Sequence, residues 1–226
     1  MVKLIEAIVY DFRLTGVTPL LMHADSIDGC DELEAWRKEP RHKGVSKAGD
    51  DRSPPWTWIV HVCNDGTNIA LPWDYLSKCC CVAGAKLIVK GRTTFKSATQ
   101  SGIRWNDQFY DFLVAGKQVA MADIWKLRED DLTFAEQKKA VREMGFDLFV
   151  KRARVGQSKH IRVRAKFDKW EVRGKFCVSM PELTADVLQQ ILSIAGQNAG
   201  LGDWRPGAPS SPGPYGMFTA EVAKVK

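Results

Sequence analysis

The part of the chain best suited to bind a charged partner is the segment between Lys151 and Lys175. Ten of its 25 residues are Lys or Arg and two are acidic, so its net charge of +8 exceeds the +6 of the whole 226-residue chain. The rest of the chain is therefore slightly acidic, and the basicity is local. Cations gathered on one segment attract polyanions, and nucleic acid is the polyanion that this pattern indicates.

Within this segment, residues 160–167 alternate strictly between polar and apolar side chains. A period of two predicts a strand with one face on a core and the other lined by cations about 6.5 to 7 Å apart, similar to the phosphate repeat of an extended strand. Gly156 is placed at the tip of a hairpin between this strand and residues 151–154. The alternative is a solvated strand face with ordinary surface charges. The predicted core set is Ile161, Val163, Ala165 and Phe167, and the predicted open set is His160, Arg162, Arg164 and Lys166.

Two other segments carry residues that suit a nucleic-acid strand. Residues 90–104 are basic and rich in Ser and Thr, which predicts a loop that orders on a ligand or a plain surface loop. Residues 196–216 contain six glycines and four prolines around Trp204 and Arg205, and glycine N–H groups can converge on phosphate while the indole stacks on a base. The alternative for this second segment is a flexible linker. The residues predicted to bind nucleic acid are Lys90, Arg92, Lys151, Arg152, Arg154, Lys159, His160, Arg162, Arg164, Lys166, Trp204 and Arg205.

A polar loop after the first predicted strand holds His23, Asp25, Asp28 and Asp31. Carboxylates at three-residue spacing can line one side of a turn and hold Mg²⁺, and a histidine can act as a general base. Aspartates at turns also commonly cap helices, so this loop is only an alternative site.

Composition excludes several other classes. No apolar run approaches the length that spans a bilayer and the first ten residues do not read as a signal peptide, so we expect a soluble, cytoplasmic protein with no membrane partner. Six cysteines without a CxxC pair, and four histidines without ligand spacing, predict buried reduced thiols and no metal or cofactor. There is no GxSxG, no P-loop and no GxGxxG after a strand.

The order of predicted elements indicates an α+β fold. Strands are expected over 2–15, 56–63, 68–71, 160–167, 170–179 and 217–225, with helices over 73–85, 133–144 and 183–195 and a short helix over 32–38. The local signals are alternation along the first strand, with Ile8, Tyr10, Phe12 and Leu14 on one face, helical spacing of Leu76, Cys79, Cys80 and Ala83, a capping box of Thr133 and Glu136, and Gly196 at the end of the last helix. This order suits a ferredoxin-like, RRM-type antiparallel sheet with helices on one face and inserted loops. We therefore expect a single domain over 1–226, with insertions at about 38–56 and 86–150.

The two ends of the chain carry motifs of a known family. A first strand reaching Leu14-Thr15-Gly16 is followed by Pro19-Leu20-Leu21, and the chain closes with a helix and a glycine-rich loop of GxGxxxxxGxG character. In these features it resembles the CRISPR-associated RAMP superfamily, most closely the guide-RNA-binding backbone subunits or phage-borne relatives of them. The glycines that carry the resemblance are Gly200, Gly202, Gly207, Gly213 and Gly216.

The resemblance implies subunits that stack as a helical homo-oligomer, or with related effector subunits, along single-stranded RNA or DNA. We therefore expect a non-enzymatic binding protein. Some members of the superfamily cut RNA with a metal and an aspartate, or with a histidine base, which makes a metal-dependent endoribonuclease using His23, Asp25, Asp28 and Asp31 the alternative. A third possibility is a subunit that binds another protein and no nucleic acid.

Overall fold

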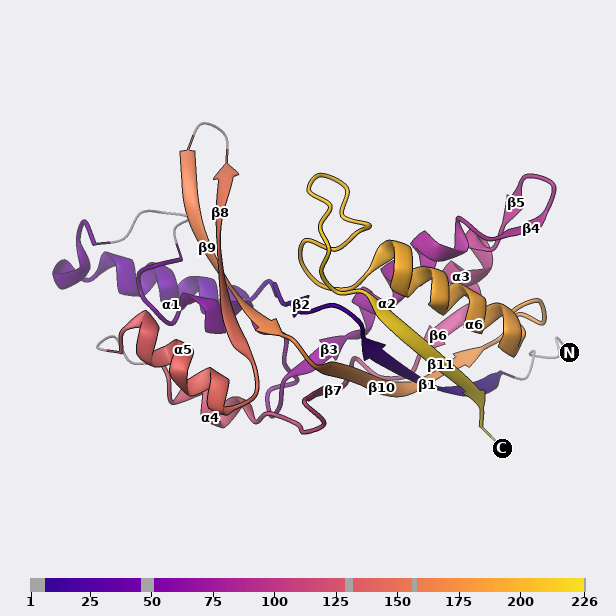
Figure 1. Cartoon of the computed structure of the whole chain (residues 1–226), viewed down its shortest axis with the longest axis horizontal. Coiled ribbons are helices and arrows are strands. Elements are labelled where there is room, and N and C mark those ends of the chain that lie inside the picture. Colours follow the sequence, from indigo (N-terminus) through magenta and orange to yellow (C-terminus); the bar gives the residue numbers. More distant parts are fainter. Residues whose placement is uncertain (1–6, 46–50, 129–131, 156–157, 226) are drawn as a thin grey trace, which may run out of the picture.

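A computed structural model describes residues 7–45, 51–128, 132–155 and 158–225, and two antiparallel sheets organise them. The molecule is elongated, with a six-stranded sheet toward one end and a three-stranded sheet in the other half (Figure 1). Helices accompany both sheets, so the chain is a mixed α and β protein, as the sequence predicts.

The six-stranded sheet is built around β1 (Ile8–Gly16), which lies between the last strand of the chain and β10 (Trp170–Val178). Along β1, Tyr10, Phe12 and Leu14 are buried while the residues between them are exposed, so the predicted alternation is confirmed. The strand order is β11-β1-β10-β7-β3, and β6 also pairs with β10. The other bounds are β3 (Ala70–Pro72), β6 (Ile103–Trp105), β7 (Phe109–Val114) and β11 (Phe218–Lys224).

Helices α2 (Trp73–Gly84), α3 (Lys96–Gly102) and α6 (Ala185–Ile194) lie on one face of this sheet (Figure 1). The buried stripe of α2 is the one that the sequence predicts, and α6 begins where the Thr184 side chain accepts a hydrogen bond from the backbone of Val187. The sequence predicts that Gly196 ends this helix. Instead, a π-helical turn, η3 (Ala195–Ala199), continues it to Gly200, whose φ of +67° turns the chain.

The second half of the molecule carries the cationic segment. Its sheet has the order β2-β9-β8. The far end of the hairpin of β8 (Asp147–Val155) and β9 (Ser158–Phe167) extends past β2 and projects from the molecule (Figure 1). The predicted hairpin is therefore confirmed, although its tip at Gly156 lies outside the described residues. The other elements here are β2 (Leu20–Leu21), α1 (Ile27–Lys38), α4 (Met121–Trp125) and α5 (Phe134–Glu143), which has the predicted Thr133 and Glu136 capping box.

Three local predictions are wrong. The predicted strand over 56–63 contains a short 3₁₀ helix (Thr57–His61), because its apolar residues are buried on all sides rather than on alternate sides. The predicted loop over 90–104 contributes to a small hairpin of β4 (Ile88–Lys90) and β5 (Thr93–Thr94), then α3 and β6. Helix α1 begins earlier than the periodicity suggests, because Ser26 caps it.

Two expectations concern cysteines and membranes. All six cysteines are free, and Cys63, Cys79 and Cys80 are buried, as predicted for reduced thiols, whereas Cys30 is exposed. Burial raises the pKa of Cys79 to about 12, which makes its thiol inert. Across the part of the chain that the structure describes, no helix combines the length and the apolar character that crossing a bilayer requires.

Candidate nucleic-acid interface

The upper part of the β8–β9 hairpin presents cations to solvent. Lys151, Arg152 and Lys159 are exposed, and His160 is partly exposed. In the antiparallel register Lys151 lies opposite Arg162, and Ala153 lies opposite His160, so these residues share one face while Arg152 lies on the other. The projecting end therefore carries positive charge on both of its faces. The side chain of Arg154 lies outside the described part of the structure.

The base of the same hairpin differs from the prediction. Arg164 is 3% exposed, and its Nη1 donates to Oδ2 of Asp51 over 2.8 Å. Arg162 donates to the other oxygen of Asp51 over 3.1 Å, and the backbone N–H of Val163 donates to Oδ2 over 2.9 Å. The prediction that Arg164 lies on an open face is wrong, and Arg162 is held by the same carboxylate.

The physical reason is that a distant segment covers this face. The backbone N–H of Asp51 donates to the carbonyl of Ile161 over 2.9 Å, which lays the chain before Pro54 along the strand. Asp51 itself is 3% exposed, so two guanidinium groups share one buried carboxylate. A buried carboxylate is tolerated only when it is paired in this way. These arginines therefore stabilise the fold and are not available to bind phosphate.

Arg164 also connects to the loop that contains His23. Its Nη2 lies 3.3 Å from Nε2 of His23, and its Nε lies 3.5 Å from Oδ2 of Asp203 without making a hydrogen bond. Desolvation, followed by repulsion from Arg164, lowers the pKa of His23 to about 4. The imidazole is therefore neutral at pH 7, and the nitrogen that would accept a proton faces Arg164. His23 does not fit the role of general base that the alternative function requires.

The glycine-rich loop packs closely against neighbouring backbone. A Cβ at Gly202 would overlap the carbonyl oxygen of Leu21, and one at Gly216 would overlap that of Leu201. Both glycines also have positive φ, at +74° and +71°. These residues are glycine because the backbone comes so close and turns through a left-handed conformation.

The loop does not offer the row of free N–H donors that the sequence suggests. The N–H groups of Gly200, Leu201, Asp203 and Gly207 donate to backbone carbonyls within 2.9 Å, and Gly213 and Gly216 do the same over 3.2 and 2.8 Å. The glycines therefore shape the loop, and side chains must supply any contact to a ligand.

Two aromatic side chains of this loop lie against Phe149 of β8, namely Tyr215, at 5.5 Å between ring centres, and Trp204. The indole of Trp204 is partly exposed, packs edge-on against Phe149 at 5.9 Å between ring centres, and lies 3.9 Å from Nζ of Lys151. Arg205 follows it and donates to the carbonyl oxygen of Gly202 over 3.0 Å. The structure therefore brings together Trp204 and Lys151, which are far apart in sequence. Phe149 is a member of this group that sequence reasoning missed, since it carries no polar signal.

Other predicted contacts lie elsewhere. Lys90 and Arg92 are exposed at the β4–β5 hairpin, which is at the far end of the molecule from the β8–β9 hairpin (Figure 1). Lys166 pairs with Asp168 over 3.1 Å. The structure thus does not gather the twelve predicted residues into one site.

The open face of the six-stranded sheet is not a stacking platform. Charged side chains on this face pair with one another, as in Arg13 with Glu171 over 2.6 Å and Lys175 with Asp11 over 3.6 Å. The aromatic residues of β1 and β10, such as Phe12 and Phe176, point into the core. RNA-binding sheets that stack bases need exposed aromatics on this face, so binding would have to use the hairpin and the loop.

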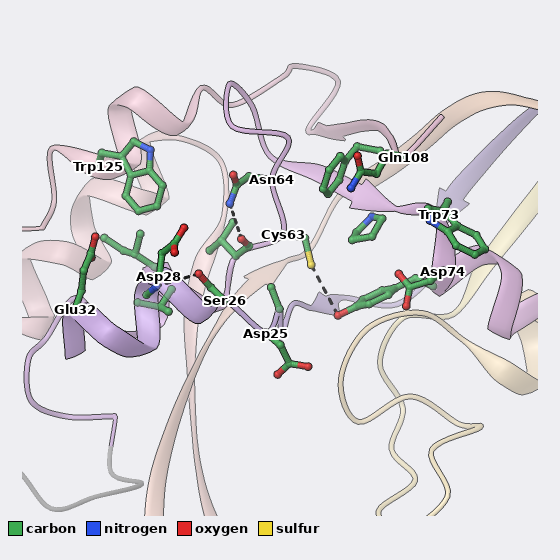
Figure 2. Close-up of a pocket in the computed structure, with 18 of the residues that line it drawn as sticks. Asp25, Ser26, Asp28, Glu32, Cys63, Asn64, Trp73, Asp74, Gln108 and Trp125 are labelled. Atoms are coloured by element: carbon green, nitrogen blue, oxygen red, sulfur yellow. Dashed lines mark hydrogen bonds between the residues drawn. The ribbon is translucent and has the colours of Figure 1, made fainter. Parts of the chain in front are cut away.

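The aspartates of the alternative site lie on a large cleft instead of around a metal. Asp25 and Asp28 line a cleft of about 700 Å³ between α1, α4 and the start of α2 (Figure 2). Asp31 lies about one turn further along α1 and does not line the cleft. In the described ranges no three His, Cys, Asp or Glu side chains come close enough to hold a metal ion. The predicted Mg²⁺ site formed by these three aspartates is therefore wrong.

The cleft was not predicted from the sequence. Trp73 and Trp125 lie on its two sides, at 44% and 38% exposure, and carboxylates of Asp28 and Glu32 line the α1 side (Figure 2). Neither tryptophan has a pattern that distinguishes it from a core residue, so only the tertiary structure reveals this surface.

No model of a known protein family matches the chain, and no similar protein was found among curated sequences. The function must therefore be argued from the residues themselves.

Proposed function

We propose that this chain is a non-enzymatic, single-stranded nucleic-acid-binding protein that assembles along its ligand. The observation that carries the proposal is the projecting β8–β9 hairpin, which exposes Lys151, Arg152 and Lys159 and places Lys151 next to Trp204 of the glycine-rich loop. Cations beside a partly exposed indole are the pairing that single-strand binding uses, because the cations hold phosphates and the ring stacks on bases without regard to sequence.

The pairing of Arg162 and Arg164 with Asp51 leaves fewer cations for the proposed site but does not remove it. Their carboxylate partner fixes the lower half of β9, so the free cations are concentrated at the projecting end. Because this ion pair holds the lower half of the hairpin in place, the protein loses little conformational entropy when a flexible nucleic-acid strand binds to the cationic end.

The arrangement of the larger sheet supports the assignment of fold type. Four of its strands follow the order β11-β1-β10-β7, with α2 between β1 and β7 in sequence and α6 between β10 and β11. A ferredoxin-like βαββαβ unit has this arrangement, in which the first and third strands are central. Together with the terminal motifs, it supports a relationship to the backbone subunits of the RAMP superfamily.

A salt titration tests the proposal. Binding of labelled oligouridylate and oligothymidylate is measured by fluorescence anisotropy for the wild type and for Lys151→Ala/Arg152→Ala/Lys159→Ala. Each phosphate contact on a single strand contributes about 0.7 to the slope of log affinity against log salt, so the triple variant should lower the slope by about 2.

The matched control removes cations that lie away from the projecting end of the hairpin. Lys117→Ala/Lys139→Ala changes two exposed lysines on the loop after β7 and on α5, and it should leave the slope unchanged. A wild type that does not bind at low salt, or a triple variant that binds like the wild type, would contradict the proposal.

A further inference from the structure

One end of the molecule carries positive charge that the nucleic-acid site does not use. Residues 75–106 contain six Lys and Arg and no acidic residue. The β4–β5 hairpin presents Lys90 and Arg92 at its exposed tip, and neither forms an ion pair among the residues that the structure describes. This hairpin is a second cationic surface, remote from the first (Figure 1).

The same hairpin exposes aliphatic side chains. Ile88 is 64% exposed and Val89 is 49% exposed, on consecutive residues of β4. Aliphatic groups have no π-face for a base and no donor for a phosphate, so they add nothing to a nucleic-acid contact. Adjacent exposed aliphatic residues among cations instead favour a protein partner that offers both carboxylates and apolar surface.

The cleft between α1, α4 and the start of α2 has this complementary chemistry. Asp25 and Asp28 line it and form no ion pair within the described ranges, whereas Asp74 is paired with Lys78. The cleft therefore keeps unpaired negative charge. In Figure 2, Asp28 faces the cleft between Ser26 and Glu32.

The aromatic wall of the cleft already holds a guanidinium. Arg128 lies 4.9 Å from the ring centre of Trp125 and pairs with Glu32. A cation between an indole and a carboxylate is stabilised both by the ring and by the charge. Trp73 and Asp28 also line the cleft, from its opposite sides (Figure 2), and Asp28 has no ion-pair partner in the described part of the chain.

The two surfaces are separate within one chain, because the β4–β5 hairpin lies at one end of the long axis (Figure 1) while the cleft opens between α1, α4 and the start of α2. We propose that the β4–β5 hairpin of one chain docks in the cleft of a second copy, with Lys90 and Arg92 meeting Asp25 and Asp28. Because the two surfaces differ, the contact is head-to-tail and can repeat from copy to copy.

This inference deepens the proposed function and rests on it in one respect, the assembly of copies along a strand. A contact of one short hairpin is small, so the pairwise interaction should be weak and salt-dependent. A bound strand would strengthen it by holding neighbouring copies at high effective concentration.

Charge reversal on each side tests the contact without nucleic acid. Sedimentation velocity is recorded against protein concentration for the wild type, for Lys90→Glu/Arg92→Glu and for Asp25→Lys/Asp28→Lys. The wild type should associate below about 1 mM at low salt, and each variant should weaken association at least about tenfold. An equimolar mixture of the two variants should associate again, because both surfaces then meet opposite charges.

Two controls keep the result interpretable. Lys117→Glu/Lys139→Glu reverses two cations elsewhere and should associate like the wild type. If Asp25→Lys/Asp28→Lys fails to fold by circular dichroism, Asp25→Asn/Asp28→Asn replaces it, with weaker association as the expected result.

The outcomes separate this inference from the proposed function. A wild type that stays monomeric up to about 1 mM, or folded variants that associate normally, overturns the inference even if oligouridylate still binds. Loss of oligouridylate binding in a wild type that associates as described overturns the proposed function alone. A mixture of variants that stays dissociated also overturns the inference, because complementary charge is its basis.

Discussion

The two halves of strand β9 carry the same residue types and have opposite roles. Near the projecting end, Lys159 and, on the adjacent strand β8, Arg152 are exposed and form no ion pair in the described structure. Near the base, Arg162 and Arg164 share the buried carboxylate of Asp51. The comparison teaches that a run of cations reports the local charge of a chain but not which of those charges is available to a partner.

The largest expected effect lies at the base of the strand. Arg164→Met should destabilise the protein by about 3 to 5 kcal/mol, because it leaves the buried Asp51 carboxylate with only part of its compensation. Urea denaturation followed by circular dichroism measures this loss. Adding Asp51→Leu to Arg164→Met should recover part of it, and a single variant that loses less than about 1 kcal/mol would show that the pair is not structural.

A smaller effect is expected where the loop meets the projecting end. Trp204→Ala should weaken the binding of oligouridylate by about 1 to 3 kcal/mol, because a stacking ring beside Lys151 is lost. Anisotropy titration at fixed salt gives the change, and Phe149→Leu, which keeps an apolar side chain beneath the indole, is the matched control. Unchanged affinity in Trp204→Ala would restrict Trp204 to packing the loop.

His23, which lies beside Arg164, should make the stability of the protein sensitive to acid. The pKa of His23 is about 4 in the folded protein and 6.5 in a free side chain, so below pH 6.5 the unfolded chain binds the proton first. The contribution of His23 to the free energy of unfolding is therefore fully present above pH 6.5, and it is lost as the pH drops from 6.5 to about 4. Because about 40% of the side chain is exposed, solvent screening reduces the loss to about 1 to 2 kcal/mol.

Denaturation midpoints across this pH range measure the histidine effect. His23→Gln keeps a polar side chain that does not titrate, and it should flatten the profile between pH 6.5 and 4. A variant whose profile matches that of the wild type would assign the acid sensitivity to other groups, His61 among them, since burial lowers the pKa of His61 as well.

The smallest effect on stability is expected at the projecting end. Lys159→Ala should change the free energy of unfolding by less than about 0.5 kcal/mol, because the side chain is exposed and unpaired. It should nevertheless lower the salt slope of nucleic-acid binding by about 0.7. Stability and binding would then separate along one strand, and a Lys159→Ala variant that unfolds easily would remove the contrast with Arg164.

Much of the fold was predictable because its signals are local. The alternation along β1, the buried stripe of α2 and the capping box of α5 each follow from residues within one element. The predicted strand over 56–63 was wrong because its local signal is ambiguous. An apolar run that is buried on all sides has no period that distinguishes a strand from a helical turn.

The candidate site was predictable only in part. The positions of Lys151, Arg152 and Lys159 on a hairpin follow from a turn and an alternating pattern. The pairing of Trp204 with Lys151, the Trp73 and Trp125 cleft and the role of Asp51 do not, because each joins segments that are distant in sequence.

The sequence by itself determined that positive charge is concentrated on a β-hairpin and that a glycine-rich segment turns sharply before the last strand, because charge and backbone freedom are properties of single residues. Only the tertiary structure decided which cations remain free. That choice depends on where Asp51 and Asp203 lie in space, and a carboxylate more than a hundred residues away along the chain can occupy the same few ångströms as the strand that it neutralises.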